Sequence, residues 1–341
     1  MGIQSDTPRL LTDKDFASDQ DVRWCPGCGD YAILKAVQRT LPQIGATPDT
    51  TVFVSGIGCS SRFPYYMATY GFHTIHGRAP AVATGLKITN PDLDVWVVTG
   101  DGDGLSIGGN HMLHALRRNI DLNILLFNNE IYGLTKGQYS PTSPCGTRSP
   151  SSPGGSVDAP LMPCVFALGA GARFVARGGD TLLKQLPEVL KRAHAHKGAS
   201  FVEILQNCVI YNPGAFDAVT DKKTAPDSVL FVEHGKPMLF GRDGRKGLVR
   251  SPDGFGLAVA TVGENGVTEA DVLVHDETNR LLGMALAALR PPLFPMVMGV
   301  IHCAPGDSFE TACRAPEVPA GGDAAADIMA LLHAGDTWTV P

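Results

Sequence analysis

The stretch DVWVVTGDGDGLSIGGN, residues 94–110, joins a short apolar run to a glycine-rich turn and then to a helix-like segment. A similar order recurs in TVFVS with GIGCSS (51–61), NILLFN with NEIYG (123–133), RFVAR with TLLKQLPEVLKRAHAH (173–196) and SFVEIL with QNCVIYNPG (200–214). Such alternation is typical of βαβ units in a mostly parallel sheet that helices cover on both faces. We therefore predict an α/β fold with a doubly wound, mostly parallel sheet, and ligands bound beyond the carboxyl ends of its strands.

The composition narrows the classes of protein that this chain can be. Its 341 residues are enough for two domains, or for one large domain with an extension. No apolar run approaches the roughly 20 residues that span a bilayer, and the amino terminus lacks the pattern of a secretory signal. We expect a cytoplasmic protein without membrane contact. The net charge of −6 argues against nucleic-acid binding, which requires a clustered basic face.

The chain divides into three parts. We predict an amino-terminal arm over residues 1–23, a ligand-binding domain over 24–212 and an irregular extension over 213–341. The first helix is expected in DYAILKAVQRTL, with Asp30 as its N-cap. Pro, Ser and Gly dominate residues 140–159, which predicts a long functional loop. Within the extension we expect a strand and a helix in DVLVHDETNRLLGMALAAL (271–289) and one more short helix in the tail.

Two polar motifs follow neighbouring predicted strands. Gly100-Asp101-Gly102 closes one strand, and Asn128-Asn129 closes the next. Carboxylate, amide and carbonyl oxygens are the ligands that a divalent cation needs beside a diphosphate. This spacing resembles the thiamine diphosphate binding motif. A calcium loop of the EF-hand type is excluded, because Met112 stands where that loop needs a glutamate.

The segment GIGCSSR, residues 56–62, resembles a degenerate dinucleotide fingerprint, which is a weak signal by itself. That interpretation also requires an acidic residue about 20 positions later, yet residues 50–91 contain no Asp or Glu. The same region gathers five cationic or titratable side chains: Arg62, His73, His76, Arg78 and Lys87. They suit a diphosphate or a carboxylate substrate, and a solvated basic face is the alternative.

Eight cysteines are present, and four of them have positions that suggest a shared site. Cys25 and Cys28 precede the first helix, while Cys59 and Cys208 each follow a predicted strand. If those strands are parallel, the four thiols meet at one sheet edge, as in a structural zinc site or an iron–sulfur cluster. Disulfide exchange would need a thioredoxin-like context around the first pair. The other four cysteines, Cys145, Cys164, Cys303 and Cys313, show no ligand spacing, and we interpret them as packing or loop residues. We interpret His111 and His114, which are three positions apart, as helix-face residues.

Five motifs together resemble the β subunit of 2-oxoacid:ferredoxin oxidoreductases, nearest to the 2-oxoglutarate type. They occur in the order WCPGCGD (24–30), GIGCSSR (56–62), HGRA (76–79), GDGDGLSIGGNH (100–111) and NNEIYGLTKGQYSPTS (128–143). The resemblance covers residues 24–212 and leaves the extension unexplained. It implies a subunit with a sheet of the thiamine diphosphate-binding type that holds thiamine diphosphate, Mg²⁺ and one [4Fe–4S] cluster.

The resemblance also implies roles for individual residues. The cluster ligands would be Cys25, Cys28, Cys59 and Cys208, and the Mg²⁺ ligands Asp101, Asn129 and the carbonyl of Ile131. The cofactor would be lined by Ile57, Gly58, Cys59, His76, Gly100, Asp101, Gly102, Asp103, Asn129, Ile131, Gly133, Leu134 and Thr135. Arg62 could pair with a substrate carboxylate.

The activity implied is the coenzyme A-dependent oxidative decarboxylation of a 2-oxoacid, 2-oxoglutarate to succinyl-CoA and CO₂ above all, or the reverse reaction. Electrons would leave through the cluster to ferredoxin. The glutamate that activates the cofactor would come from the α subunit, so this chain alone should be inactive. Two alternatives stay open: a non-redox thiamine diphosphate-dependent decarboxylase or lyase subunit with zinc on the four cysteines, and a scaffold subunit without cofactors.

Overall fold

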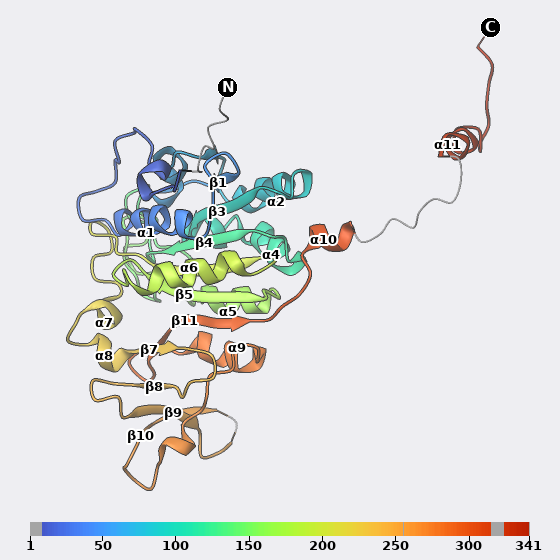
Figure 1. The fold of residues 1–341 in the computed structure, drawn as a ribbon. Coiled ribbons are helices and arrows are strands. Elements are labelled where there is room, and N and C mark those ends of the chain that lie inside the picture. Colours follow the sequence, from blue (N-terminus) through green and yellow to red (C-terminus); the bar gives the residue numbers. More distant parts are fainter. Residues whose placement is uncertain (1–8, 255, 315–323, 341) are drawn as a thin grey trace, which may run out of the picture.

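A central sheet of eight strands organises the computed structural model, which describes residues 9–254, 256–314 and 324–340 (Figure 1). The strands lie in the order β2-β1-β3-β4-β6-β5-β11-β7, and the first six are mutually parallel. Strand β11 runs antiparallel to β5 and parallel to β7. Their bounds are β1 Thr51–Ser55, β2 Tyr70–His73, β3 Asp94–Gly100, β4 Asn123–Asn128, β5 Phe174–Gly179, β6 Ser200–Leu205, β7 Val229–Val232 and β11 Met296–Cys303. The predicted mostly parallel sheet is confirmed.

Helices cover both faces of this sheet, which makes the fold doubly wound. On β1 the side chains alternate, so Val52 and Val54 join one hydrophobic core while Phe53 joins the other. Helices α1 and α6 contribute to the core that contains Phe53, and α2, α4, α5 and α9 contribute to the opposite core. The bounds are α1 Asp30–Gln43, α2 Ala79–Thr89, α3 Asp101–Leu105, α4 Gly109–Arg118, α5 Pro163–Gly169, α6 Gln185–Ala195, α7 Asp217–Thr220, α8 Ala225–Ser228, α9 Arg280–Ala288, α10 Phe309–Cys313 and α11 Ala324–Leu332, with short 3₁₀ helices η1 Asp13–Phe16, η2 Ser60–Tyr66 and η3 Glu269–Asp271.

The predicted N-cap of the first helix is wrong. Helix α1 begins at Asp30 itself, and Gly29 occupies the cap position without a side-chain hydrogen bond. The N–H of Gly29 donates to the carbonyl of Asn207 at 3.2 Å, so the helix start is held against the segment after β6. Asp30 is buried at this helix start, and within the described residues neither of its carboxylate oxygens has a hydrogen-bond partner.

The carboxy-terminal extension is more regular than the sequence suggests. Strands β7 and β11 belong to the central sheet, so a boundary at residue 212 divides one sheet between two parts of the chain. A separate antiparallel sheet contains β8 Leu239–Phe240, β9 Lys246–Arg250 and β10 Leu257–Thr261. The expected helix is present as α9, but the expected strand before it is reduced to a single bridge between Val274 and Pro237. The actual strand, β11, follows the helix.

The predicted amino-terminal arm and carboxy-terminal tail are only partly described by the structure. The first eight residues of the expected arm and residues 315–323 of the tail lie outside the described residues, while the predicted tail helix is present as α11. In the rest of the arm, Phe16 is fully buried. No helix of the described chain combines the length and the apolar character that crossing a membrane requires.

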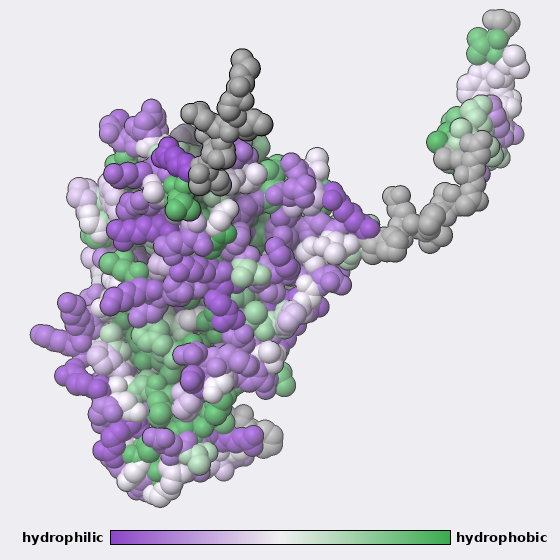
Figure 2. Space-filling view, viewed as in Figure 1, coloured by the Kyte–Doolittle hydropathy of each residue, from purple (hydrophilic) through white to green (hydrophobic). Residues whose placement is uncertain are grey.

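The visible surface is largely hydrophilic, with apolar side chains gathered near β7 and β8 (Figure 2). A shallow groove in that region is lined by residues of both sheets, among them Leu182, Phe231 and Phe240. The polar edge of the central sheet, by contrast, holds the predicted site.

Candidate cofactor and thiol sites

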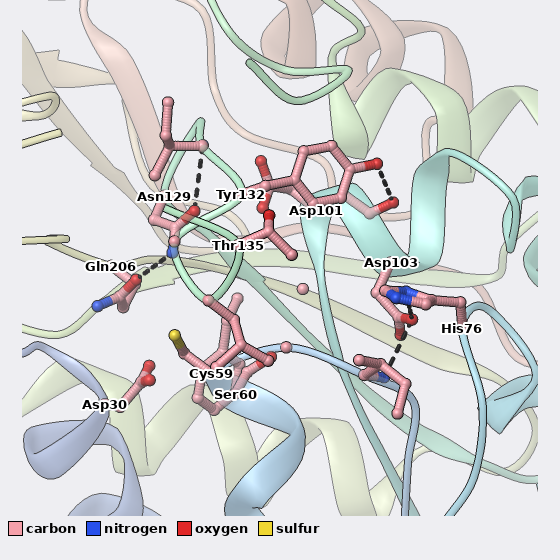
Figure 3. Close-up of a pocket in the computed structure, with 18 residues that line it drawn as sticks. Asp30, Cys59, Ser60, His76, Asp101, Asp103, Asn129, Tyr132, Thr135 and Gln206 are labelled. Atoms are coloured by element: carbon pink, nitrogen blue, oxygen red, sulfur yellow. Dashed lines mark hydrogen bonds and ion pairs between the residues drawn. The ribbon is translucent and has the colours of Figure 1, made fainter. Parts of the chain in front are cut away.

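Every residue predicted to line the cofactor borders one half-open cleft beyond the carboxyl ends of β1, β3 and β4 (Figure 3). The thirteen residues are Ile57, Gly58, Cys59, His76, Gly100, Asp101, Gly102, Asp103, Asn129, Ile131, Gly133, Leu134 and Thr135. They come from four chain segments that are far apart in the sequence. The parallel sheet brings these segments together, because the carboxyl ends of parallel strands share one edge.

Asp103 fixes the backbone of two of these segments. Its Oδ1 accepts hydrogen bonds from the N–H of Ile57 at 3.1 Å and of Gly77 at 2.8 Å. Its Oδ2 accepts one from the hydroxyl of Thr99 at 2.6 Å. His76 Nδ1 lies 3.5 Å from Asp103 Oδ1. The carboxylate therefore holds the turns on which Ile57 and His76 reach the cleft.

Asp101 is buried, and the long loop supplies its partners. The hydroxyls of Ser140 and Thr142 each donate to Asp101 Oδ2 at 2.6 Å. Burial raises the pKa of Asp101, although these hydrogen bonds act in the opposite direction. Both hydroxyls therefore fix the orientation of the carboxylate through the same oxygen. The predicted loop over residues 140–159 thus contributes directly to the site.

Asn129 and Ile131 flank a residue in an unusual backbone conformation. Glu130 has a φ of 57°, in the left-handed region that non-glycine residues rarely adopt. Asn129 Oδ1 accepts from the N–H of Ile131 at 3.2 Å, and Asn129 Nδ2 donates to Gln206 Oε1 at 2.8 Å. The tight turn brings the amide of Asn129 and the backbone of Ile131 to the same cleft as Asp101. Together they are the hard oxygen donors that suit Mg²⁺.

Close packing explains one glycine of the GDG motif. A Cβ at Gly102 would overlap the ring of Tyr132, whose hydroxyl donates to the carbonyl of Gly102 at 2.9 Å. Any side chain at this position would therefore displace the turn that carries Ile131.

Five lining residues are missing from the prediction. They are Asp30, Ser60, Phe127, Tyr132 and Gln206. Tyr132 lies within the NNEIYG motif and Gln206 directly follows β6, so their positions alone could have identified them. Asp30 gave no such signal, because an aspartate before a helical pattern is usually a cap. The pKa of the Asp30 carboxyl is raised to about 7, chiefly by burial.

The four predicted cluster cysteines line a second cavity of about 220 Å³. Cys25 and Cys28 come from the turn before α1, Cys59 from the turn after β1 and Cys208 from the segment after β6. A Cβ at Gly133 would lie 3.5 Å from the sulfur of Cys208 and 3.6 Å from that of Cys59, so this glycine leaves room beside both thiols. Burial first, and then the charge of the Asp30 carboxylate, raise the pKa of Cys59 to about 12.

The thiol cavity and the cofactor cleft share a wall. Five residues line both: Cys59, Asn129, Gly133, Leu134 and Gln206. Gln206 connects them directly, since its Nε2 lies 3.2 Å from Cys28 Sγ while its Oε1 accepts from Asn129. A group held by the thiols would therefore be the immediate neighbour of a molecule in the cleft.

Arg62 lies in the thiol cavity and does not line the cofactor cleft. Its Nε donates to the hydroxyl of Tyr66 at 2.9 Å. The predicted contact with a substrate carboxylate therefore gains no support from the geometry of the cleft.

The remaining candidates lie elsewhere. Cys164 is buried in the core, where its thiol lies 3.1 Å from Glu203 Oε2. His111 and His114 are partly buried on α4. Within the described residues, no three His, Cys, Asp or Glu side chains converge at the distances of a single metal ion.

Comparison with known proteins gives consistent matches. The family described as thiamine pyrophosphate enzyme, C-terminal TPP binding domain, matches residues 56–204. The 2-oxoglutarate oxidoreductase subunit KorB of Mycobacterium tuberculosis is 52% identical over 96% of this chain and 88% of its own length. The 2-oxoacid:ferredoxin oxidoreductase 2, subunit beta, of Aeropyrum pernix is 39% identical over 71% of this chain and 74% of its own.

A solved structure agrees over nearly the whole chain. It is a 2-oxoglutarate:ferredoxin oxidoreductase from Magnetococcus marinus with 2-oxoglutarate, coenzyme A and succinyl-CoA bound. The matched chain has a TM-score of 0.74 and 32% sequence identity, and the match covers 94% of this chain and 96% of that one.

Proposed function

Because this chain belongs to the family of 2-oxoacid:ferredoxin oxidoreductase β subunits, we propose that it is the cofactor-binding subunit of an enzyme that converts 2-oxoglutarate and coenzyme A to succinyl-CoA and CO₂, or catalyses the reverse reaction. The names of the Mycobacterium and Magnetococcus relatives support 2-oxoglutarate as the substrate. One observation carries the proposal: the cleft of the predicted cofactor residues shares a wall with the cavity of the four cysteines.

The cleft suits thiamine diphosphate with Mg²⁺. Asp101, Asn129 and the carbonyl of Ile131 would hold the cation, and the two loop hydroxyls that fix the Asp101 carboxylate through its Oδ2 support this assignment. The bound cofactor supplies a nucleophilic carbon for the decarboxylation of 2-oxoacids. The protein's part is to orient the Asp101 carboxylate with the two loop hydroxyls and to keep the turns of Ile57 and His76 in place through Asp103.

The thiol cavity suits an iron–sulfur cluster better than zinc. Four thiolates on one zinc ion would lie about 3.8 Å apart, from a bond length of about 2.3 Å in a tetrahedron. The described cysteines share a cavity without converging at single-ion distances. In a [4Fe–4S] cluster each thiolate binds a different iron, so the ligands are farther apart. Cys25, Cys28, Cys59 and Cys208 would bind the cluster, which supplies one-electron transfer.

Two components would come from outside the chain. No glutamate among the described residues lines the cleft, and we assign the glutamate that activates the cofactor to the α subunit. Ferredoxin would be the electron acceptor. Reduced thiols and this chemistry both fit the cytoplasm.

The test is anaerobic purification of the chain co-expressed with its α subunit, followed by iron, sulfide and zinc analysis. We expect broad visible absorbance that bleaches with dithionite, and reduction of a viologen dye that depends on 2-oxoglutarate and coenzyme A. A colourless zinc protein that decarboxylates without reducing the dye would support the non-redox alternative. A protein that retains neither cofactor would support a scaffold role. Pyruvate and branched 2-oxoacids in the same assay define the substrate preference.

A further inference from the structure

Arg62 is one of two arginines in the thiol cavity that the proposed reaction leaves without a role. We propose that Arg62 sets the reduction potential of the iron–sulfur centre in the four-cysteine cavity, as a fixed positive charge beside it. This inference rests on the proposed function, because it requires that centre.

The backbone and one tyrosine hold the Arg62 side chain. Arg62 lies three positions after Cys59, and its N–H donates to the Cys59 carbonyl at 3.2 Å, within the turn that leads into η2. Its Nε donates to the Tyr66 hydroxyl at 2.9 Å, and its guanidinium lies 6.0 Å from the centroid of the Tyr66 ring. Tyr66 is itself buried and packs edge-on against Trp24, with ring centroids 4.8 Å apart. The cation therefore has a fixed position at the cavity wall.

The charge of Arg62 is not neutralised by a neighbour. Residues 50–91 contain no Asp or Glu, and no carboxylate of the described residues forms an ion pair with Arg62 within 4.0 Å. A half-buried, unpaired cation is screened less by solvent than an exposed one.

Arg23 provides the contrast, because it lines the same cavity. Its side chain is 72% exposed, and its Nη2 lies 3.9 Å from Asp21 Oδ2. Water and the nearby carboxylate reduce its effect on the cavity. Of the two arginines, Arg62 is the one whose charge reaches the centre.

The direction of the effect follows from electrostatics. Reduction adds one negative charge to a centre that four thiolates already surround. A nearby cation stabilises the reduced form more than the oxidised form, and net charge is one of the factors that set cluster potentials. Removing the Arg62 charge must therefore lower the potential.

The experiment measures the midpoint potential of the centre in the α–β complex, by anaerobic dithionite titration followed by electron paramagnetic resonance. For Arg62→Gln we expect the equilibrium constant for one-electron reduction to fall about tenfold, which corresponds to about 59 mV. Arg62→Lys keeps the charge and should stay closer to wild type. Arg23→Gln is the matched control and should leave the potential within the error of the titration.

Three outcomes separate the hypotheses. A wild-type complex without iron refutes the proposed function, not this inference alone. An iron-replete Arg62→Gln complex with the wild-type potential overturns the inference. If, at that unchanged potential, the KM rises for 2-oxoglutarate but not for pyruvate, Arg62 is assigned to the substrate instead. If Arg62→Gln loses iron, Arg62→Met takes its place, since it also removes the charge and keeps an unbranched side chain. An iron-replete Arg62→Met complex with the wild-type potential also overturns the inference.

Discussion

Replacing Glu203 by Gln should destabilise the fold strongly, because Glu203 is the partner of a fully buried arginine. Arg177 Nε donates to Glu203 Oε2 at 2.7 Å, and both side chains are 1% exposed. The other nitrogens of Arg177 donate to backbone carbonyls, Nη1 to Val297 at 3.0 Å and Nη2 to Ala287 at 3.3 Å. Glutamine at position 203 would leave the guanidinium charge buried without a counter-ion.

The expected cost is that of an uncompensated buried charge. Removing one member of a buried ion pair costs about 3–5 kcal/mol. Burial by itself raises the pKa of Glu203, but the charge and hydrogen bonds of Arg177 outweigh it, so the pKa lies below its ordinary value of 4.5. A lowered carboxylate pKa means that the stabilisation is present above pH 4.5 and is lost as the pH falls through the folded-state pKa.

Urea unfolding of the full chain, followed by tryptophan fluorescence, measures this cost. At an m-value of about 3 kcal/mol/M, the midpoint of Glu203→Gln should fall by more than about 1 M at pH 7. The difference from wild type should shrink below pH 4.5. Glu188→Gln is the control: Glu188 forms an exposed pair with Lys191, and its loss should cost at most about 1 kcal/mol.

A double-mutant cycle tests the reasoning further. Replacing both Arg177 and Glu203 by apolar residues removes both charges, so the double variant should be less destabilised than the sum of the single variants. Additive effects of the two substitutions, or a Glu203→Gln variant no less stable than Glu188→Gln, would refute the idea that the pair is a coupled, desolvated unit.

Three further predictions concern the cofactor sites. Gly102→Ala would force a Cβ into the Tyr132 ring and should weaken thiamine diphosphate binding at least about tenfold in calorimetry, the effect of about 1.4 kcal/mol. Thr142→Val removes a hydrogen bond to the Asp101 carboxylate worth about 1.5–3 kcal/mol, so the Mg²⁺ concentration needed for half-maximal cofactor binding should rise about 10- to 100-fold. Cys208→Ser should lower the iron content and visible absorbance of the complex.

Each of these variants has a matched control. Gly109→Ala adds a Cβ where nothing lies within 4 Å and should bind the cofactor normally. Thr142→Ser keeps the hydroxyl and should keep the Mg²⁺ requirement. Cys145→Ser changes an exposed loop cysteine and should leave the iron content unchanged. Equal effects of a variant and its control would contradict the assigned role.

The sequence predicted the polar edge of the sheet well because each strand there is marked by a local pattern, an apolar run followed by a turn. Each apolar run that ends in a glycine turn became a parallel strand, and the motifs after β1, β3 and β4 met in one cleft. Parallel geometry alone accounts for that meeting. The cysteine set was predictable for the same reason, since Cys59 and Cys208 follow strands of the same direction.

The sequence failed where tertiary contacts override a local preference. Asp30 has the pattern of an N-cap, but Gly29 occupies the cap position, its N–H donates to the segment after β6, and Asp30 itself is buried in the first turn of the helix. Strand β11 escaped notice because it pairs antiparallel with β5, more than a hundred residues earlier in the chain.

The extension that the family motifs leave unexplained is connected to the site through buried polar contacts. The Thr142 hydroxyl, which donates to Asp101, also lies 3.0 Å from Asn128 Oδ1, and Asn128 Nδ2 donates to Glu203 Oε1 at 2.8 Å. Glu203 pairs with Arg177, whose remaining donors end on the carbonyls of α9 and β11.

A second contact reaches the turn of the predicted metal ligands from the same part of the chain. Arg290 Nη1 lies 3.7 Å from Glu130 Oε1, in the strained residue between the predicted ligands Asn129 and Ile131. Deleting the chain beyond residue 212 would therefore remove the carbonyl acceptors of the two Arg177 Nη nitrogens and the arginine that faces Glu130. The motifs supply the residues of the predicted cofactor site, and the extension supplies buried contacts that hold these residues in place. A domain boundary at residue 212 would therefore cut through the central sheet, to which β7 and β11 also belong.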